Sequence, residues 1–207
     1  MGRLFTWYEN RLYPRLMDAS LRGKRVAVQR QTLLSGVQGK VLEIGFGTGL
    51  NLAAYPAHIK TVTAIDLHPD MPGQVSEHLQ RDLAVDIRSM SAERLDFADE
   101  TFDSVVSTFT LRSIPDLDAA LRGIHRVLKP GGGFFFLEHG LSRHRIVAGI
   151  QELTDPLYVI LACGCHVNRD MSAHISASGL RIEWCEAFYP LARISGYTLK
   201  GVARKTA

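Results

Sequence analysis

The sequence feature that most constrains the fold is the stretch Val41–Gly49 (VLEIGFGTG), in which a mainly apolar run leads into three alternating glycines. Such a run predicts a buried strand, a tight turn and a helix that begins at about Leu50. Glycines at a turn let a ligand approach the main chain closely, and the exposed N–H groups favour an anionic group. The spacing is G-x-G-x-G, because Leu50 stands where a dinucleotide fingerprint has its third glycine. An NAD-binding domain or an ordinary glycine turn therefore remains an alternative.

A second acidic residue follows at the place where a nucleoside-binding α/β fold needs one. The stretch Thr61–Asp66 (TVTAID) reads as a short buried strand that ends in a carboxylate, 17 residues after Gly49. A carboxylate at the end of the second strand suits hydrogen bonds to ribose hydroxyls. The two stretches together predict one nucleoside-binding edge of an α/β sheet.

The rest of the chain continues the alternation of strands and helices. Further strands are predicted over Val85–Arg88, Asp103–Phe109, Phe134–Leu137, Leu180–Ala187 and Ser195–Ala203, and helices over Pro72–Leu83, Pro115–Leu128 and Ser172–Ser178. Ligands of open α/β sheets bind beyond the carboxyl ends of the central strands. We therefore expect residues 108–111 to line the site.

Three stretches resemble class I S-adenosyl-L-methionine (SAM)-dependent methyltransferases with a methyltransferase type 11 domain. They are E-x-G-x-G-x-G with the distant Asp66, the acidic stretch Ser91–Asp103, and Arg126–Gly132 (RVLKPGG). The resemblance implies a Rossmann-like, mostly parallel seven-stranded sheet, with an antiparallel last strand and helices on both faces. It also implies SAM as the cofactor. The implied cofactor contacts are Glu43, Gly45, Phe46, Gly47, Thr48, Gly49, Asn51, Asp66, Leu67, Met90, Ser91, Ala92 and Thr108; Ser91 stands where the family often has aspartate.

The second half of the chain resembles a narrower group, the methyltransferase-like 7 thiol S-methyltransferases. The matching stretches include Glu138-His139, Asp155-Pro156 and Gly164-Cys165 with Arg169. The resemblance implies a thiol as methyl acceptor, and we expect residues 140–172 to be an insertion that sets specificity. Apolar walls of the acceptor pocket are expected from Tyr8, Phe109, Leu111 and Tyr158.

His139 and Asp155 are the candidate catalytic residues. His139 is either a base that titrates near its ordinary pKa of ~6.5 or a structural group, and Asp155 would assist through a water. A phospholipid headgroup or another amine is the alternative acceptor. A non-enzymatic SAM-binding partner subunit is the alternative to an enzyme.

Residues 1–35 read as a helical extension ahead of a domain over residues 36–207. Apolar residues recur at helical spacing, Pro14 divides the segment, and arginines and lysines outnumber acids. Three interpretations stay open: a helix packed on the domain edge with a solvated basic face, a lid over the cofactor, or a weak contact with a membrane surface.

Composition excludes several classes of protein. A net charge of +3 is too small to indicate nucleic acid as a partner, and 46% hydrophobic with 22% charged residues is typical of a globular domain. Three cysteines are too few for a disulfide framework or a zinc site, so we predict no metal and a reducing, cytoplasmic location. The expected partner is a small-molecule acceptor, and the expected oligomeric state is monomer or homodimer.

Overall fold

The structure is a computed structural model that describes residues 8, 19–67, 83–189 and 197–206. The helix predicted over Pro72–Leu83 lies outside these residues except for its last position. Residues 1–7 and 9–18 of the N-terminal extension and the start of the last predicted strand also lie outside them.

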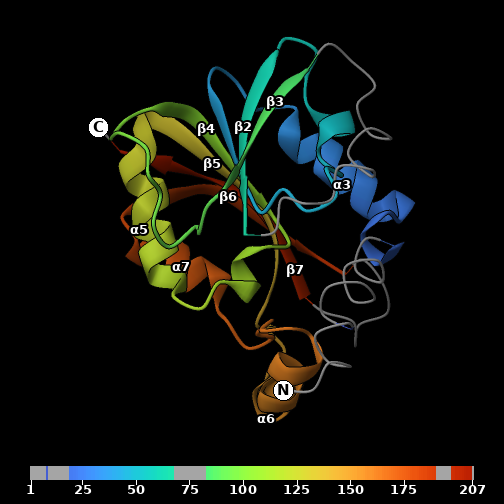
Figure 1. Cartoon of the computed structure of the whole chain (residues 1–207). Coiled ribbons are helices and arrows are strands. Elements are labelled where there is room, and N and C mark those ends of the chain that lie inside the picture. The colour runs from blue at the N-terminus through green and yellow to red at the C-terminus, as the bar shows by residue number, and fades with distance from the viewer. Residues whose placement is uncertain (1–7, 9–18, 68–82, 190–196, 207) are drawn as a thin grey trace.

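Within the described residues, seven strands form one sheet in the order β3-β2-β1-β4-β5-β7-β6 (Figure 1). β7 runs antiparallel to both of its neighbours, and the other neighbouring pairs are parallel. The strands are β1 (Val41–Ile44), β2 (Thr61–Asp66), β3 (Ala84–Ser89), β4 (Phe102–Thr108), β5 (Leu128–Gly140), β6 (Leu180–Phe188) and β7 (Tyr197–Lys205). The predicted Rossmann-like sheet with an antiparallel last strand is confirmed.

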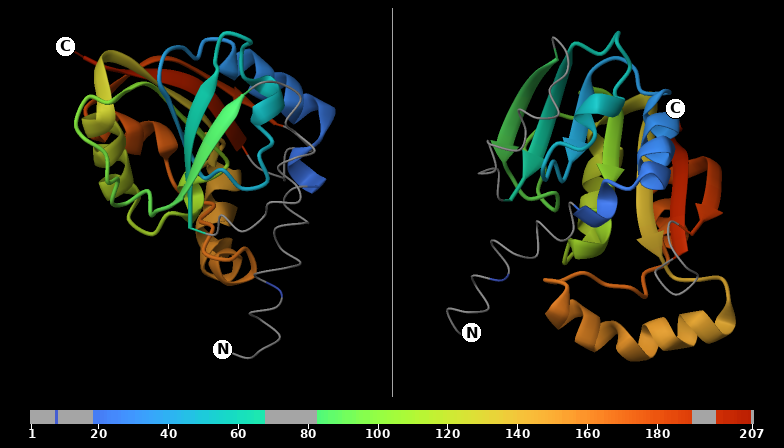
Figure 2. Two further views of the ribbon diagram at one scale, coloured as in Figure 1. Left: turned by 45° about the horizontal axis from the view of Figure 1, so that its top comes forward. Right: turned by 90° about the vertical axis from the view of Figure 1, so that its right-hand side faces the viewer.

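Helices cover both faces of this sheet (Figures 1 and 2). The helix α3 lies on one face, and α5 and α7 lie on the other, while α6 lies beyond the carboxyl end of β5 (Figure 2). The helical elements are α3 (Lys24–Leu34), η2 (Leu52–Ala54), η3 (Leu111–Ser113), α5 (Leu117–Val127), α6 (Arg145–Leu161) and α7 (Met171–Ala177).

The central strands are buried because helices pack on each side of them. All four residues of β1 are buried, as expected of a parallel strand with two covered faces. On one face, α5 buries an apolar stripe that includes Leu117, Leu121 and Ile124, and the Asp116 carboxylate caps its N-terminus by accepting a hydrogen bond from Ala119 N at 2.9 Å. This packing fixes the β4 and β5 ends that form the site.

Two elements differ from the sequence-based expectation. The helix expected at about Leu50 is only the single 3-10 turn η2, because Pro56 forces the preceding Tyr55 into an extended conformation (ψ 141°). The expected loop-like insertion over residues 140–172 contains the 17-residue helix α6, which continues through Pro156. The first difference means that only a short 3-10 turn follows the glycine turn. The second adds a long helix after β5.

The described part of the N-terminal extension belongs to the domain. Val26, Leu33 and Leu34 of α3 are buried in the same core cluster as residues of β1, β2, β4 and β5. Arg30, expected on a solvated basic face, is only 4% exposed, whereas Lys24 and Arg25 are exposed. In the part of the chain that the structure describes, the helices are too short or too polar to cross a membrane.

Candidate active site

The glycine turn joins β1 to η2 and adopts a conformation that glycine favours. Gly45, Gly47 and Gly49 have φ angles of +75°, +53° and +78°. A Cβ atom at Gly45 would overlap the Thr110 side chain, whereas one at Gly47 would meet no atom within 4 Å. The turn therefore leaves open space above Gly47, as a site for the amino-acid end of SAM requires.

Asp66 lies directly against this turn. Its Oδ2 accepts a hydrogen bond from Gly47 N at 2.8 Å, and Ile65 O accepts from Gly45 N at 2.9 Å. Leu67, the next residue, is 60% exposed, so an apolar side chain stands at the mouth of the site. The carboxylate predicted for the ribose and the backbone predicted for the amino-acid end are thus brought together.

Glu43 is the buried anchor beneath the turn. Its Oε1 accepts from Asn51 Nδ2 at 2.9 Å, and its Oε2 accepts from Tyr55 Oη at 2.6 Å. Asn51 Nδ2 also donates to Thr108 Oγ1 at 3.1 Å, which links the turn to the end of β4. Burial raises the pKa of Glu43 to about 7, although both hydrogen bonds oppose this. In this arrangement Glu43 acts on the site through Asn51 and Tyr55, which hold the turn.

The remaining predicted cofactor residues divide into backbone and side-chain groups. Phe46 and Thr48 are buried, and the Phe46 side chain packs in the core, so its backbone is the part that can meet a ligand. Met90 N donates to Asp66 O at 3.1 Å, which places the loop of Met90, Ser91 and Ala92 beside the ribose carboxylate. Ser91 Oγ is engaged by Glu93, whose backbone N donates to it at 3.2 Å.

The acceptor side begins at the strained end of β4. Phe109 has a φ of +57°, which is uncommon for an aromatic residue, and its backbone N donates to Leu137 O at 2.8 Å. Its ring packs against that of His139, with centroids 4.9 Å apart. Leu111 differs from the expectation of a pocket wall: its side chain is fully buried in the core and has no surface to offer an acceptor.

Glu138 is a site residue that sequence reasoning missed. Its Oε1 accepts hydrogen bonds from Ser107 Oγ (2.9 Å), Thr110 N (2.9 Å) and Leu111 N (3.2 Å), so it holds the turn that follows β4. Its Oε2 is buried and has no hydrogen-bond partner within the described chain. Burial raises the pKa of Glu138 to about 7. An acid at the end of the apolar run FFFLE was the signal available in the sequence.

His139 lies next to it, at the end of β5. The Nδ1 atom pairs with Thr198 Oγ1 of β7 at 2.8 Å. Burial, with a smaller contribution from the charge of Arg112, lowers the pKa of His139 to about 3. Burial thus keeps the imidazole neutral at physiological pH, which disfavours a base that titrates near 6.5.

Arg112 is a positive charge close to this pair that sequence reasoning also missed. It lies in η3, is 7% exposed, and its guanidinium makes no hydrogen bond or ion pair with the described residues. Its charge acts on Glu138 and His139. A buried arginine normally has a partner, so this one is suited to an anionic group in the site.

The candidates of the α6 region lie close to one another. Asp155 is buried and accepts from Val167 N at 2.7 Å and pairs with His166 Nδ1 at 2.9 Å, so both oxygens hold the segment after α6. Tyr158 is 43% exposed, and Tyr8 Oη donates to Leu161 O at 2.8 Å, one turn further along the same helix. The contacts of Asp155 favour a structural role over a catalytic one.

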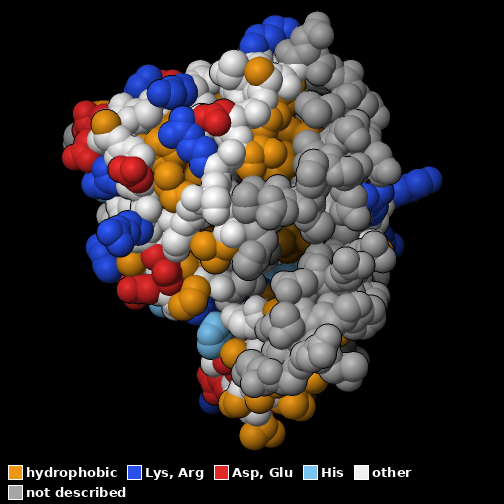
Figure 3. Space-filling model, in the orientation of Figure 1, with side chains coloured by type: hydrophobic (Ala, Val, Ile, Leu, Met, Phe, Trp, Pro, Cys, Tyr) orange, Lys and Arg blue, Asp and Glu red, His pale blue; other side chains and the backbone are white. Residues whose placement is uncertain are grey.

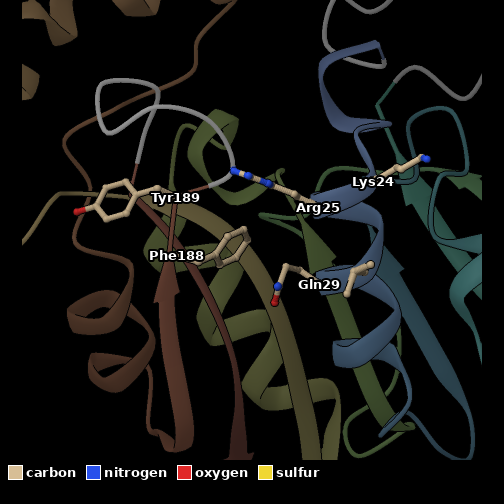
Figure 4. A pocket seen from close by; sticks show the side chains of 6 residues that line it. Lys24, Arg25, Gln29, Phe188 and Tyr189 are labelled. Carbon is tan, nitrogen blue, oxygen red and sulfur yellow. The ribbon is translucent and has the colours of Figure 1, made fainter.

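An open depression of about 410 Å³ lies elsewhere, between α3 and the end of β6 (Figure 4). Gln29 of α3 points toward Phe188 across it (Figure 4), and Lys24, Arg25, Val28 and Tyr189 complete its lining. It contains none of the predicted cofactor residues. Over the described residues, no three His, Cys, Asp or Glu side chains are grouped as metal ligands would be.

The chain is similar to known methyltransferases in sequence and in fold. A family model described as a methyltransferase domain matches residues 42–136. Thiol S-methyltransferase TMT1A of Homo sapiens is 29% identical over 95% of this chain and 89% of its own length. Phosphatidylethanolamine N-methyltransferase of Cereibacter sphaeroides is 36% identical over 55% of this chain and 57% of its own length.

A solved structure shares the fold. The N-methyltransferase NodS of Bradyrhizobium japonicum WM9, in complex with S-adenosyl-l-homocysteine, superposes with a TM-score of 0.65 at 17% identity, over 93% of this chain and 97% of that one. The glycine turn, Asp66 and the carboxyl edge of the sheet stand where such a fold places its ligand. The matched domain and these relatives indicate that the chain is a SAM-dependent methyltransferase, and SAM is its cofactor.

Proposed function

We propose that this methyltransferase acts on a thiol, which it methylates as the thiolate. The observation that carries the proposal is Arg112, a residue only 7% exposed, whose side chain makes no hydrogen bond or ion pair with the described residues and whose charge acts on His139. A positive charge near the acceptor lowers the pKa of a thiol and favours its anion, whereas it disfavours a protonated amine.

The chemistry asks little of the protein beyond alignment and the exclusion of water. SAM supplies a methyl group already activated on a sulfonium. The thiolate sulfur forms a bond to the methyl carbon as the carbon–sulfonium bond breaks, and the electron pair of that bond stays on the departing sulfur. The thiol proton leaves to solvent before this step, since a thiol has a pKa of ~8.5 and needs no strong base. Phe109 and the neutral His139 present an apolar surface to the sulfur.

Similarity favours the same acceptor class. The relative named as a thiol S-methyltransferase aligns over nearly the whole chain, including the region after β5 where acceptor specificity is expected. The relative named as a phosphatidylethanolamine N-methyltransferase aligns over about half of the chain. An amine acceptor is the alternative, and it would need a base to remove a proton.

The test is a panel of alkyl and aryl thiols, amines and phosphatidylethanolamine, with labelled SAM. We expect thiols to be methylated, with the pH midpoint of kcat/KM following the pKa of each thiol. In Arg112→Met, the midpoint should move to higher pH by about one unit and kcat/KM at neutral pH should fall ~10-fold, with unchanged SAM affinity. Arg122→Met, a substitution on the exposed side of α5, is the matched control. Methylation of amines but not thiols would overturn the thiol proposal and leave the fold and cofactor intact.

A further inference from the structure

The helix α6 presents its apolar side to solvent and its polar side to the protein. Large apolar side chains that are 55–83% exposed recur along it: Ile146, Ile150, Leu153, Leu157, Ile160 and Leu161. At 3.6 residues per turn these six fall within an arc of about 100°. They are most of the exposed large apolar residues of the described chain.

The opposite side of α6 is polar and attached to the domain. Asp155 lies half a turn away from the centre of the apolar arc, and its carboxylate holds Val167 N and His166. Gln151 Nε2 donates to Gly140 O at 3.2 Å and to Val167 O at 3.0 Å, and its Oε1 accepts from Ser142 N at 2.8 Å. These hydrogen bonds fix the rotation of the helix, so the apolar arc is held outward and is not a frayed core face.

A helix that covered a domain core would be oriented the other way. Surface helices bury the apolar stripe and expose the polar face. Contiguous exposed apolar surface of this kind marks an interaction site. In the space-filling view, hydrophobic side chains gather at the lower end of the molecule, where Figure 1 places α6 (Figure 3).

Charge at the start of α6 indicates the kind of surface that covers the apolar arc. Arg143, His144 and Arg145 are exposed, and the two arginines make no ion pair with the described residues. No acidic residue occupies the first turn, although an acid is what a helix N-terminus favours. Basic groups there are unfavourable unless an anion lies beside them. Exposed basic residues flanking an apolar arc, on a helix too short to span a bilayer, match a helix that lies in a membrane interface.

We infer that α6 docks this enzyme on an anionic lipid surface, with its apolar arc in the acyl boundary and Arg143 and Arg145 at the lipid phosphates. The helix follows β5 and lies beyond the carboxyl end of that strand (Figure 2), so docking places the acceptor side of the site next to the membrane. A hydrophobic acceptor dissolved in the lipid then reaches the enzyme without crossing bulk water.

Vesicle flotation of the full chain tests this inference. Vesicles of phosphatidylcholine with phosphatidylglycerol should carry the protein, and Leu153→Glu should reduce binding at least ~10-fold. The matched control is Val28→Glu, which places the same acid at an exposed apolar position of α3 and should leave binding unchanged. Arg143→Gln with Arg145→Gln should weaken binding to anionic vesicles by about 5-fold for each arginine and have little effect on phosphatidylcholine alone.

Two further measurements separate lipid docking from misfolding of the variants and from self-association. Calorimetric SAM affinity that matches the wild type shows that each variant is folded, because Leu153 lies outside the cofactor site. Hydrogen exchange of the α6 amides should be slower when vesicles are present than when the protein is alone in solution. Retained vesicle binding in Leu153→Glu would overturn the inference. So would sedimentation showing a dimer that dissociates in Leu153→Glu, with no binding of the wild type to vesicles, since the arc would then join two copies.

Discussion

The site has a cofactor side at the ends of β1 and β2 and an acceptor side at the ends of β4 and β5. The two sides differ in how completely their buried charged groups are hydrogen-bonded. On the cofactor side, Glu43 has a partner for each oxygen, and Asp66 binds the backbone of the glycine turn. On the acceptor side, Glu138 has one buried oxygen without a hydrogen-bond partner among the described residues. Arg112 is only 7% exposed, and its side chain makes no hydrogen bond or ion pair with the described residues. Phe109, which precedes Arg112 by three residues, holds a strained backbone.

This difference teaches which half of the site is complete before the acceptor arrives. A satisfied polar network rigidifies its surroundings, so the cofactor side is preorganised for a ligand common to the whole family. Unsatisfied buried groups cost stability and are retained at functional sites. The acceptor side therefore carries groups whose polar atoms are left for an acceptor to meet.

The largest expected effect is a loss of SAM affinity on substitution of a glycine in the glycine turn, compared with a glycine elsewhere in the fold. Gly47→Val should reduce SAM affinity at least ~100-fold, about 2.7 kcal/mol, because the side chain would fill the open space above the turn at a positive φ. Gly131→Val is the matched control, since Gly131 also has a positive φ (+75°) and open surroundings. It lies near the start of β5, away from the carboxyl ends of the strands that form the site. Calorimetry should show lost binding in the first variant and wild-type binding in the second; equal losses would assign the effect to backbone strain.

The next effect concerns the ribose carboxylate. Asp66→Asn should weaken SAM binding by about 1–3 kcal/mol, because the amide keeps only one acceptor oxygen and has a donor NH2 group in place of the other. Asp86→Asn on the neighbouring strand, whose carboxylate pairs with the exposed Arg88, should have no effect on affinity. Unchanged SAM binding in Asp66→Asn would remove this residue from the cofactor site.

A third pair of variants compares the two buried glutamates directly. Glu43→Ala should raise the Kd for SAM ~10-fold, because Asn51 and Tyr55 lose the acceptor that holds the turn. Glu138→Ala should leave that Kd within about 2-fold and lower kcat/KM for the acceptor ~10-fold, because the turn of Thr110 and Leu111 is released. Calorimetry and steady-state rates would contradict the division if both variants changed the same quantity.

The pH dependence of stability should reveal the raised pKa of Glu138 when the wild type is compared with a variant at this position. Its pKa is raised from 4.5 to about 7 in the folded state, so the native protein binds this proton more tightly than the unfolded chain. Stability is then lost as pH rises through this interval, by up to about 3 kcal/mol. In Glu138→Gln this loss should fall by about half, because the pKa of Glu43 is raised to about 7 as well and its contribution remains. Urea unfolding of both proteins at pH 4.5 and 7.5 checks this, and a constant difference between them would argue against a raised pKa.

The smallest expected effect is that His139 does not contribute a titration to the pH profile of kcat/KM near neutral pH. His139 has a pKa lowered to about 3, so its protonation destabilises the fold only as pH falls from 6.5 towards 3. Between pH 6 and 8, His139→Gln should change the height of the pH profile of kcat/KM by less than about 3-fold and not its midpoint. A midpoint near 6.5 that disappears in the variant would restore the histidine as a base.

The sequence signals for the cofactor side are local. Three glycines at fixed spacing specify a turn whatever surrounds it, and apolar runs that end in Glu43 or Asp66 place the acids at strand ends. The mostly parallel seven-stranded sheet with its antiparallel last strand followed from the family resemblance and is confirmed. The helix at Leu50 was wrong because Pro56 acts a few residues beyond the turn.

Tertiary structure alone decided the acceptor side and α6. Glu138 and Arg112 become significant only when β4 and β5 lie side by side and burial removes the water that would have solvated them. The spacing of the apolar residues in α6 was present in the chain and would fit any amphipathic helix. Whether that face turns inward or outward depends on Asp155 and Gln151, whose partners lie in the strand before the helix and in the loops on either side of it. Periodicity defines a face, and hydrogen bonds to the rest of the fold decide where it points.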